Sequence, residues 1–339
     1  MTWVALTDEQ RMLAATTAQM VADHPTFTGA EIEHQRGSRE LWGAMVASGL
    51  VALVIAEQPD AGGESTLDAA LVVEQLARGV SAVPYLGTVL ALGLLRAAAP
   101  HGAEITEVLD GRPGCVVLDS TLSALAPRGI AVDVGPGALA VGVEGGAVRS
   151  ASLGAHLDAL DLSRPLANAL GGRTELGAIS SAARARWLAQ ALALLCADLV
   201  GTCTGALEGA VAHARVRQQF GRPIGSFQAV QQLCADQLVT VEACRSITWQ
   251  AAWAVDALEP AEALAQAQMA KAYCSETART VCEAAIQVWG GLGMTWECPA
   301  HRYLRRALLD RQLLGDERAQ LGAIVHERLV TAATKAKGR

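Results

Sequence analysis

The chain has 339 residues, of which 51% are hydrophobic and 18% are charged, and its net charge is −7. This composition excludes a disordered or acidic tail protein, because disorder requires low hydrophobicity and high charge. The basic residues form no stripe along the chain, so we expect no nucleic-acid partner. Aromatic residues make up only 4% of the chain. The core must therefore be built from Ala, Leu and Val, which favours helices.

The sequence lacks two kinds of signal, one for membrane insertion or export and one for metal binding. No apolar run reaches the roughly 20 residues that span a bilayer, and no charged N-terminal start precedes an apolar stretch. We therefore expect a cytoplasmic protein without a membrane span. The eight cysteines include no CxxC pair and have no histidine at ligand spacing, so we expect buried thiols and no metal.

Residues 1–110 are predicted to form an N-terminal helical domain. Thr7 and Gln10 have the spacing of a capping box at the start of its first helix. Proline and glycine residues separate further helices, which are expected over Ser38–Ser48, Ser65–Gly79 and Tyr85–Ala99.

Residues 111–172 are rich in glycine and proline and are predicted to form a small β domain. The short apolar runs Cys115–Leu118, Ile130–Val134 and Ala138–Val143 fit strands between tight turns. The region has only about 60 residues. We therefore expect a truncated domain, too small for a complete barrel with a ligand site of its own.

Residues 173–339 return to long helical patterns and are predicted to form a C-terminal four-helix bundle. Helices are expected over Glu175–Arg217, Phe227–Leu258, Pro260–Trp289 and Pro299–Ala333, the last of them interrupted near Gly315. The expected fold class is therefore mainly α: an N-terminal helical domain, a small β region and a helical bundle.

Two segments of the predicted bundle carry residues that are suited to binding a ligand. The first, residues 217–231, reads RQQFGRPIGSFQAVQ and forms a turn between helices; the second, residues 287–299, reads QVWGGLGMTWECP. The glycines of the second segment allow a close approach of the backbone to a ligand. An arginine can pair with pyrophosphate oxygens, and a ring can pack against a nucleotide. A glycine C-cap with a surface arginine explains either segment alone equally well.

In this order within a helical bundle, the two segments resemble the RxxFGxPIxxFQxxQ and QxxGGxG…ExP motifs of the acyl-CoA dehydrogenase family. The resemblance is specific over residues 200–306, and the domain order agrees along the whole chain. It implies an acyl-CoA substrate, electron-transfer flavoprotein or a similar acceptor, and FAD as the cofactor. It further implies that one group of residues contacts an FAD held by the neighbouring subunit: Arg217, Phe220, Gln228, Gln287, Gly290 and Gly291.

The chain also departs from the family's pattern. It has no TEPxxGSD-like stretch, which in the family holds the flavin ring and the acyl-CoA, between residues 111 and 172. The family's catalytic glutamate follows an RD pair in an EGT motif, whereas here Arg305-Arg306 replaces RD and Leu314 replaces the glutamate. The family's other base position, on the first bundle helix, falls near Ala191.

Dehydrogenation of an acyl thioester needs a carboxylate that removes the α-proton. We therefore assign no catalytic residue to this chain, with Asp316 and Glu317 as weak candidates for a displaced base. The favoured alternative for these two acids is the first turn of the last helix, where negative charge is stabilising.

These departures favour a companion subunit of a heteromeric acyl-CoA dehydrogenase, in an α2β2 assembly with a full-length partner that holds most of the acyl-CoA. The chain resembles the short, base-lacking subunits of actinobacterial enzymes that act on steroid side-chain CoA thioesters. Two alternatives stay open: a self-sufficient flavoenzyme with a displaced base, and a helical scaffold that binds no flavin.

Overall fold

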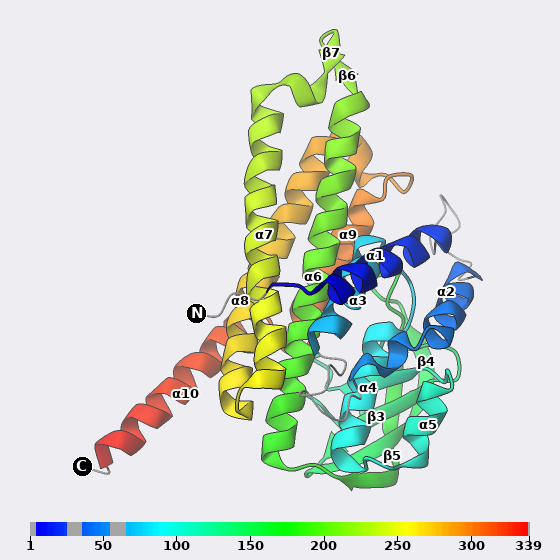
Figure 1. Ribbon diagram of the computed structural model, residues 1–339, viewed down its shortest axis with the longest axis vertical. Coiled ribbons are helices and arrows are strands. Elements are labelled where there is room, and N and C mark those ends of the chain that lie inside the picture. Colours follow the sequence, from blue (N-terminus) through cyan, green and yellow to red (C-terminus); the bar gives the residue numbers. More distant parts are fainter. Residues whose placement is uncertain (1–4, 26–35, 55–65, 338–339) are drawn as a thin grey trace.

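The computed structural model describes residues 5–25, 36–54 and 66–337 (Figure 1). Its N-terminal part contains the helices α1 (Asp8–Asp23), α2 (Arg36–Ala47), α3 (Thr66–Arg78), α4 (Tyr85–Ala98) and α5 (Ala103–Leu109), and the 3-10 helix η2 (Leu50–Val54). The capping box of α1 is confirmed: the Gln10 N–H donates to Thr7 Oγ1 at 3.2 Å, and the Thr7 N–H donates to Gln10 Oε1 at 3.1 Å. The predicted helices agree with α2, α3 and α4 to within two residues at each end that the structure describes; Ser65 lies outside the described residues.

The middle region is a closed five-stranded barrel in the order β1-β2-β5-β4-β3, in which β1 and β3 run parallel. Its strands are β1 (Gly114–Leu118), β2 (Gly129–Val132), β3 (Leu139–Glu144), β4 (Ala147–Leu157) and β5 (Leu166–Ala178). The expectation that this region is too small for a complete barrel is therefore wrong. Strands β4 and β5 are long, and four register shifts along their pairing bend them enough to close the sheet.

The interior of the barrel is filled by small side chains. Its buried cluster is Cys115, Val117, Ala131, Val134, Ala138, Ala140, Ala167 and Ala169. Side chains of this size fill a barrel of five strands and leave no interior for a ligand. The barrel therefore acts as a packing surface for the helices.

The C-terminal part is the helical bundle, with α6 (Ser181–Val216), α7 (Gln228–Ala257), α8 (Pro260–Trp289), α9 (Ala300–Gln312) and α10 (Glu317–Lys337). The bounds of α8 are as predicted, and the expected interruption near Gly315 separates α9 from α10. The start of the first bundle helix was predicted too early. Helix α6 begins at Ser181, because β5 continues to Ala178 and Ser180 provides the N-cap, accepting the Ala183 N–H at 3.1 Å. The β domain therefore extends beyond residue 172.

Helix α6 is the central element of the fold and packs against α3, α7 and α8. A Cβ atom on Gly201 would lie 2.1 Å from the Glu74 carbonyl oxygen, and one on Gly205 would lie 2.3 Å from the Arg78 carbonyl oxygen. Glycine at these positions lets α3 lie directly on α6. By length and composition α6 could cross a membrane, but 83% of its most apolar window is buried inside the protein.

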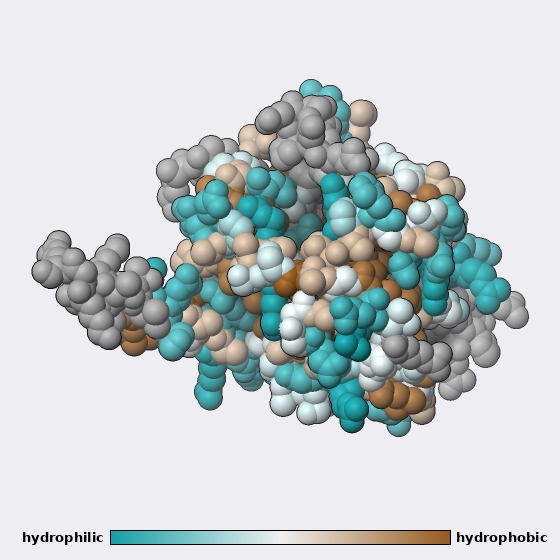
Figure 2. All heavy atoms as spheres, turned by 90° about the horizontal axis from the view of Figure 1, so that it is seen from below, coloured by the Kyte–Doolittle hydropathy of each residue, from teal (hydrophilic) through white to brown (hydrophobic). Residues whose placement is uncertain are grey.

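The surface carries mixed polarity. Seen from below, hydrophilic residues are interspersed with smaller apolar areas (Figure 2). Helix α10 projects away from the body beside the lower end of the bundle (Figure 1).

Candidate functional site

The connection between α6 and α7 lies at the top of the bundle in Figure 1 and holds the first motif. Helix α6 ends at Val216, and the strands β6 (Gln218–Gln219) and β7 (Arg222–Pro223) form a hairpin before the 3-10 helix η4 (Ile224–Ser226). The tip of the hairpin places Phe220 in the left-handed region, at φ 53°, with 91% of its surface exposed. A bulky residue in this conformation carries strain, which is common at ligand contacts.

Aromatic contacts order the base of this hairpin. The Phe220 and Phe227 rings meet edge to face, with centroids 6.0 Å apart. The guanidinium of Arg222 lies over the Phe227 ring, 4.1 Å from its centroid. These contacts hold the exposed Phe220 ring next to the start of α7, where Gln228 is also exposed.

The second motif follows the C-terminal end of α8. Gly290 is the C-cap, at φ 64°, and the 3-10 helix η5 (Gly290–Met294) follows. A Cβ atom on Gly290 or Gly291 would meet no atom within 4 Å. Backbone conformation explains glycine at position 290, but packing does not explain it at 291. The pair leaves a stretch of backbone that a ligand can approach.

The structure brings the two motifs to the same end of the bundle. His213, one turn before Arg217, stacks on Trp289, directly before Gly290; the ring centroids are 4.1 Å apart and the planes are inclined by 22°. All six residues that the resemblance implied lie on the surface here, and Arg217 forms no ion pair with a described residue. A free guanidinium, an exposed ring, two amides and open glycine backbone fit one side of a dinucleotide such as FAD.

The α9–α10 turn carries Leu314, the residue that the resemblance aligns with the family's catalytic glutamate. Leu314, at φ 58°, is 5% exposed, and its N–H donates to the Leu122 carbonyl oxygen in the β1–β2 loop at 2.7 Å. The Gln320 amide donates to the Leu314 carbonyl oxygen at 2.7 Å. Direct backbone contact thus joins the turn to the barrel loop.

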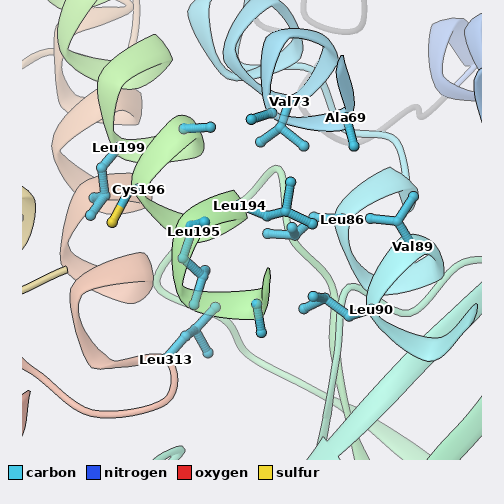
Figure 3. Packing of buried hydrophobic residues seen from close by; sticks show 14 of the residues in the cluster. Ala69, Val73, Leu86, Val89, Leu90, Leu194, Leu195, Cys196, Leu199 and Leu313 are labelled. Atoms are coloured by element: carbon cyan, nitrogen blue, oxygen red, sulfur yellow. The ribbon is translucent and has the colours of Figure 1, made fainter. Parts of the chain in front are cut away.

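Between this turn, α4, α6 and the barrel there is a cavity of only about 10 Å³. Leucine side chains from three directions fill the space, including Leu86, Leu90, Leu195, Leu313 and Leu314. Figure 3 shows Leu86 and Leu90 of α4 near Leu195 of α6, with Leu313 below. A cavity of this size holds at most one water molecule. Ala191, the second base position, is fully buried in the same core.

Asp316 and Glu317 both have local structural partners. Asp316 Oδ1 accepts the Ala319 N–H at 3.0 Å, as an N-cap does. Glu317 Oε2 accepts from Arg311 Nε at 2.7 Å, and this bond lowers the pKa of Glu317 to about 2. A carboxylate with so low a pKa is a weak proton acceptor at neutral pH.

A buried ion cluster beside the cavity was not anticipated from the sequence. Asp198 on α6 accepts from Arg306 Nε and Nη2, both at 2.7 Å, and from Arg164 Nη2 at 2.8 Å. Burial favours the neutral acid, but the two guanidinium groups hold the pKa of Asp198 below its ordinary range. Burial raises the pKa of the neighbouring Asp310, which lies 3.3 Å from Arg164 Nη1. Asp198 could have been noticed as the single charge in the apolar run ALALLCADLVG.

Lys271 is a second buried charge that the sequence did not reveal. Its Nζ donates to the Arg311 carbonyl oxygen at 2.9 Å, to the Gly315 carbonyl oxygen at 3.2 Å and to Ser275 Oγ at 3.0 Å. The side chain thereby fastens the α9–α10 turn to α8. Burial lowers the pKa of Lys271 to about 8.

No group of three or more His, Cys, Asp or Glu residues that could hold a metal ion occurs in the described part of the chain. Seven of the eight cysteines are buried as free thiols, and Cys234 is half-buried.

Comparison with known proteins agrees with this architecture. Residues 7–102 match the acyl-CoA dehydrogenase N-terminal domain, and residues 181–330 match the acyl-CoA dehydrogenase C-terminal domain. The chain belongs to the acyl-CoA dehydrogenase family. The resemblance seen in the two motifs is thus confirmed at the level of the family and the fold.

One related protein and two solved structures are informative. The chain is 35% identical to acyl-CoA dehydrogenase IpdE2 of Mycobacterium tuberculosis, over 94% of this chain and 97% of that protein. Among solved structures it resembles a variant of the Tcur3481–Tcur3483 steroid ACAD, with a TM-score of 0.78, 25% identity and coverage of 96% and 99%. It also resembles the ChsE4–ChsE5 complex of Mycobacterium tuberculosis, with a TM-score of 0.75, 25% identity and coverage of 96% and 98%.

Proposed function

We propose that this chain is a companion subunit of a hetero-oligomeric acyl-CoA dehydrogenase. It lends one side of an FAD site to a full-length partner and has no complete flavin and substrate cleft of its own. The hydrogen bond from the Leu314 N–H to the Leu122 carbonyl oxygen carries this proposal. It joins the barrel loop to the turn where, by the family resemblance, the catalytic glutamate would lie, so no space for a flavin ring or a thioester is left between them.

The exposed motifs support a contribution to a site that another chain completes. Arg217 would pair with the pyrophosphate of FAD, the backbone at Gly290–Gly291 would lie against the dinucleotide, and Phe220 would pack beside it. The bundle end that carries them is also incompletely covered. In α7 the first buried residue is Val241, more than three turns into the helix. Val216 and Val239 are more than 70% exposed. We take this uncovered part of α7 as the surface that the partner subunit contacts.

The reaction we propose for the assembly is α,β-dehydrogenation of an acyl-CoA thioester. Bound FAD supplies the acceptor for the hydride, and electron-transfer flavoprotein or a similar acceptor reoxidises it. This chain positions and retains the dinucleotide, while the base comes from the partner, because Leu314 and Ala191 cannot accept a proton. The likeness to a steroid ACAD favours a steroid-derived acyl-CoA, and the likeness to the two-component ChsE4–ChsE5 complex favours a hetero-oligomer, which we propose to be α2β2 and cytoplasmic.

Two other functions are less well supported. A self-sufficient enzyme with a displaced base would need Asp316 or Glu317 to be free, and both have structural partners. A scaffold without flavin would not need an unpaired Arg217 beside two open glycines. Absence of 450 nm absorbance from the complex would favour that scaffold.

The proposal is tested by Arg217→Ala in the co-expressed complex. The guanidinium–pyrophosphate contact contributes about 1.5–3 kcal/mol, so FAD occupancy at limiting FAD should fall about tenfold or more. The turnover number per bound flavin should stay unchanged, because Arg217 does not touch the reacting atoms. Arg112→Ala, which removes an exposed arginine beside the barrel, is the matched control and should leave occupancy unchanged. Undiminished FAD occupancy in Arg217→Ala would contradict the assignment.

A further inference from the structure

We call the six exposed residues that would contact FAD the FAD half-site: Arg217, Phe220, Gln228, Gln287, Gly290 and Gly291. Its two motifs lie at the ends of two different helices. Arg217 is the C-cap of α6, and its N–H donates to the His213 carbonyl oxygen at 2.9 Å. Gly290 is the C-cap of α8 and directly follows Trp289. A dinucleotide that contacts both motifs therefore requires a fixed separation between two helix ends.

Buried residues continue almost to the end of both helices. Among the described residues, Ala214 is the last buried residue of α6 and Val288 is the last one of α8. Beyond these residues the last carbonyl groups have no partner within the helix, so the final turns depend on side-chain contacts to stay ordered. A side-chain contact between the last turns of α6 and α8 therefore helps to set the distance between the two helix ends.

The stack of His213 on Trp289 is such a contact. Its geometry, with centroids 4.1 Å apart and planes inclined by 22°, is that of parallel stacking. Burial and the nearby Arg217 both lower the pKa of His213, so the ring is neutral at pH 7. The neutral ring adds no charge to the site. Its contribution comes from its shape and position.

We propose that His213 and Trp289 are positioning residues of the FAD half-site. The stacked rings fix the distance between the Arg217 guanidinium and the Gly290–Gly291 backbone, so that both contact one dinucleotide. This inference rests on the proposed function. It makes a specific claim: the half-site requires a flat ring at position 213, and it does not require an imidazole.

The test uses the complex co-expressed with its partner, stripped of flavin and titrated with FAD. A stack of aromatic rings contributes about 0.5–1.5 kcal/mol, and the middle of this range, about 1 kcal/mol, corresponds to a Kd for FAD that is raised about fivefold in His213→Ala. His213→Phe keeps a flat ring and should restore the Kd to within about twofold of wild type. At saturating FAD, kcat should be unchanged in both variants, because neither side chain touches the reacting atoms.

A second His–Trp pair provides the matched control. His301 meets Trp296 edge to face, with centroids 5.0 Å apart, outside the six half-site residues. His301→Ala should leave the Kd for FAD unchanged. Equal losses in His213→Ala and His301→Ala would show a general packing effect and overturn the inference, as would equal losses in His213→Ala and His213→Phe.

The outcomes also separate this inference from the proposed function. If wild-type complex binds FAD and His213→Ala binds it equally well, the positioning role is wrong and the companion-subunit function stands. If wild-type complex binds no FAD, both are wrong. Where His213→Ala lowers the yield of complex, Trp289→Leu gives the same test from the other ring: it removes the aromatic face and should raise the Kd for FAD about fivefold.

Discussion

Replacing Asp198 by asparagine should destabilise the protein more than any surface change. The carboxylate of Asp198 accepts three bonds of 2.7–2.8 Å from Arg306 and Arg164, and all three side chains are at most 5% exposed. Asparagine has nearly the same shape, so packing is kept while both guanidinium groups lose the carboxylate of Asp198. Breaking a buried ion pair from one side costs about 3–5 kcal/mol. At about 2 °C per kcal/mol for a domain of this size, the Tm should fall by roughly 6–10 °C.

The assay is thermal unfolding of the co-expressed complex at one protein concentration, and two variants serve as controls. Glu208→Gln breaks an exposed pair in which Arg78 makes two bonds of 2.8 Å, and such pairs contribute about 0.2–1 kcal/mol. Asp310→Asn changes a carboxyl whose pKa burial raises and which lies 3.3 Å from Arg164 Nη1, so its Tm should fall less than that of Asp198→Asn. A loss below about 2 °C in Asp198→Asn would refute the reasoning, as would equal losses in Asp198→Asn and Asp310→Asn.

Two further outcomes follow from the α9–α10 turn. Asp316→Asn and Glu317→Gln should each leave kcat of the complex within a few-fold of wild type, whereas loss of a true general base costs about 10²–10⁴-fold; a thousand-fold loss in steady-state turnover would make this chain catalytic. The pKa of Lys271 is lowered to about 8 from an ordinary 10.5, so the unfolded chain binds more protons between these values. The free energy of unfolding of wild type should therefore rise by about 2 kcal/mol relative to that of Lys271→Met between pH 7.5 and pH 10. The measurement is the Tm of both proteins across this pH range. A difference in Tm that does not change with pH would contradict the lowered pKa.

Local signals in the sequence predicted most of the helices. The capping box at Thr7 marked the start of α1, and Pro260 with Gly290 marked both ends of α8, because these residues act on their own backbone. Barrel closure was not predictable in this way. It depends on register shifts between β4 and β5, which arise from pairing between separate segments.

The candidate site was also predictable only in part from the sequence. The resemblance named the six residues of the half-site, and the structure places them at one end of the bundle. The stack of His213 on Trp289 and the bond from Leu314 to Leu122 join residues far apart in the sequence. Neither follows from a local pattern. The acids at positions 316 and 317 could be weighed as caps from the sequence, but the pairing of Glu317 with Arg311 required coordinates.

The most direct measurement of the central claim is the flavin content of the purified complex, taken as moles of FAD per pair of chains from the absorbance at 450 nm and the protein concentration. With its own cleft closed to a cavity of about 10 Å³, this chain should add no second flavin. We expect one FAD per pair in the α2β2 assembly, and no flavin or poor solubility when this chain is expressed alone. Two FAD per pair, or a yellow and active assembly of this chain alone, would contradict the account.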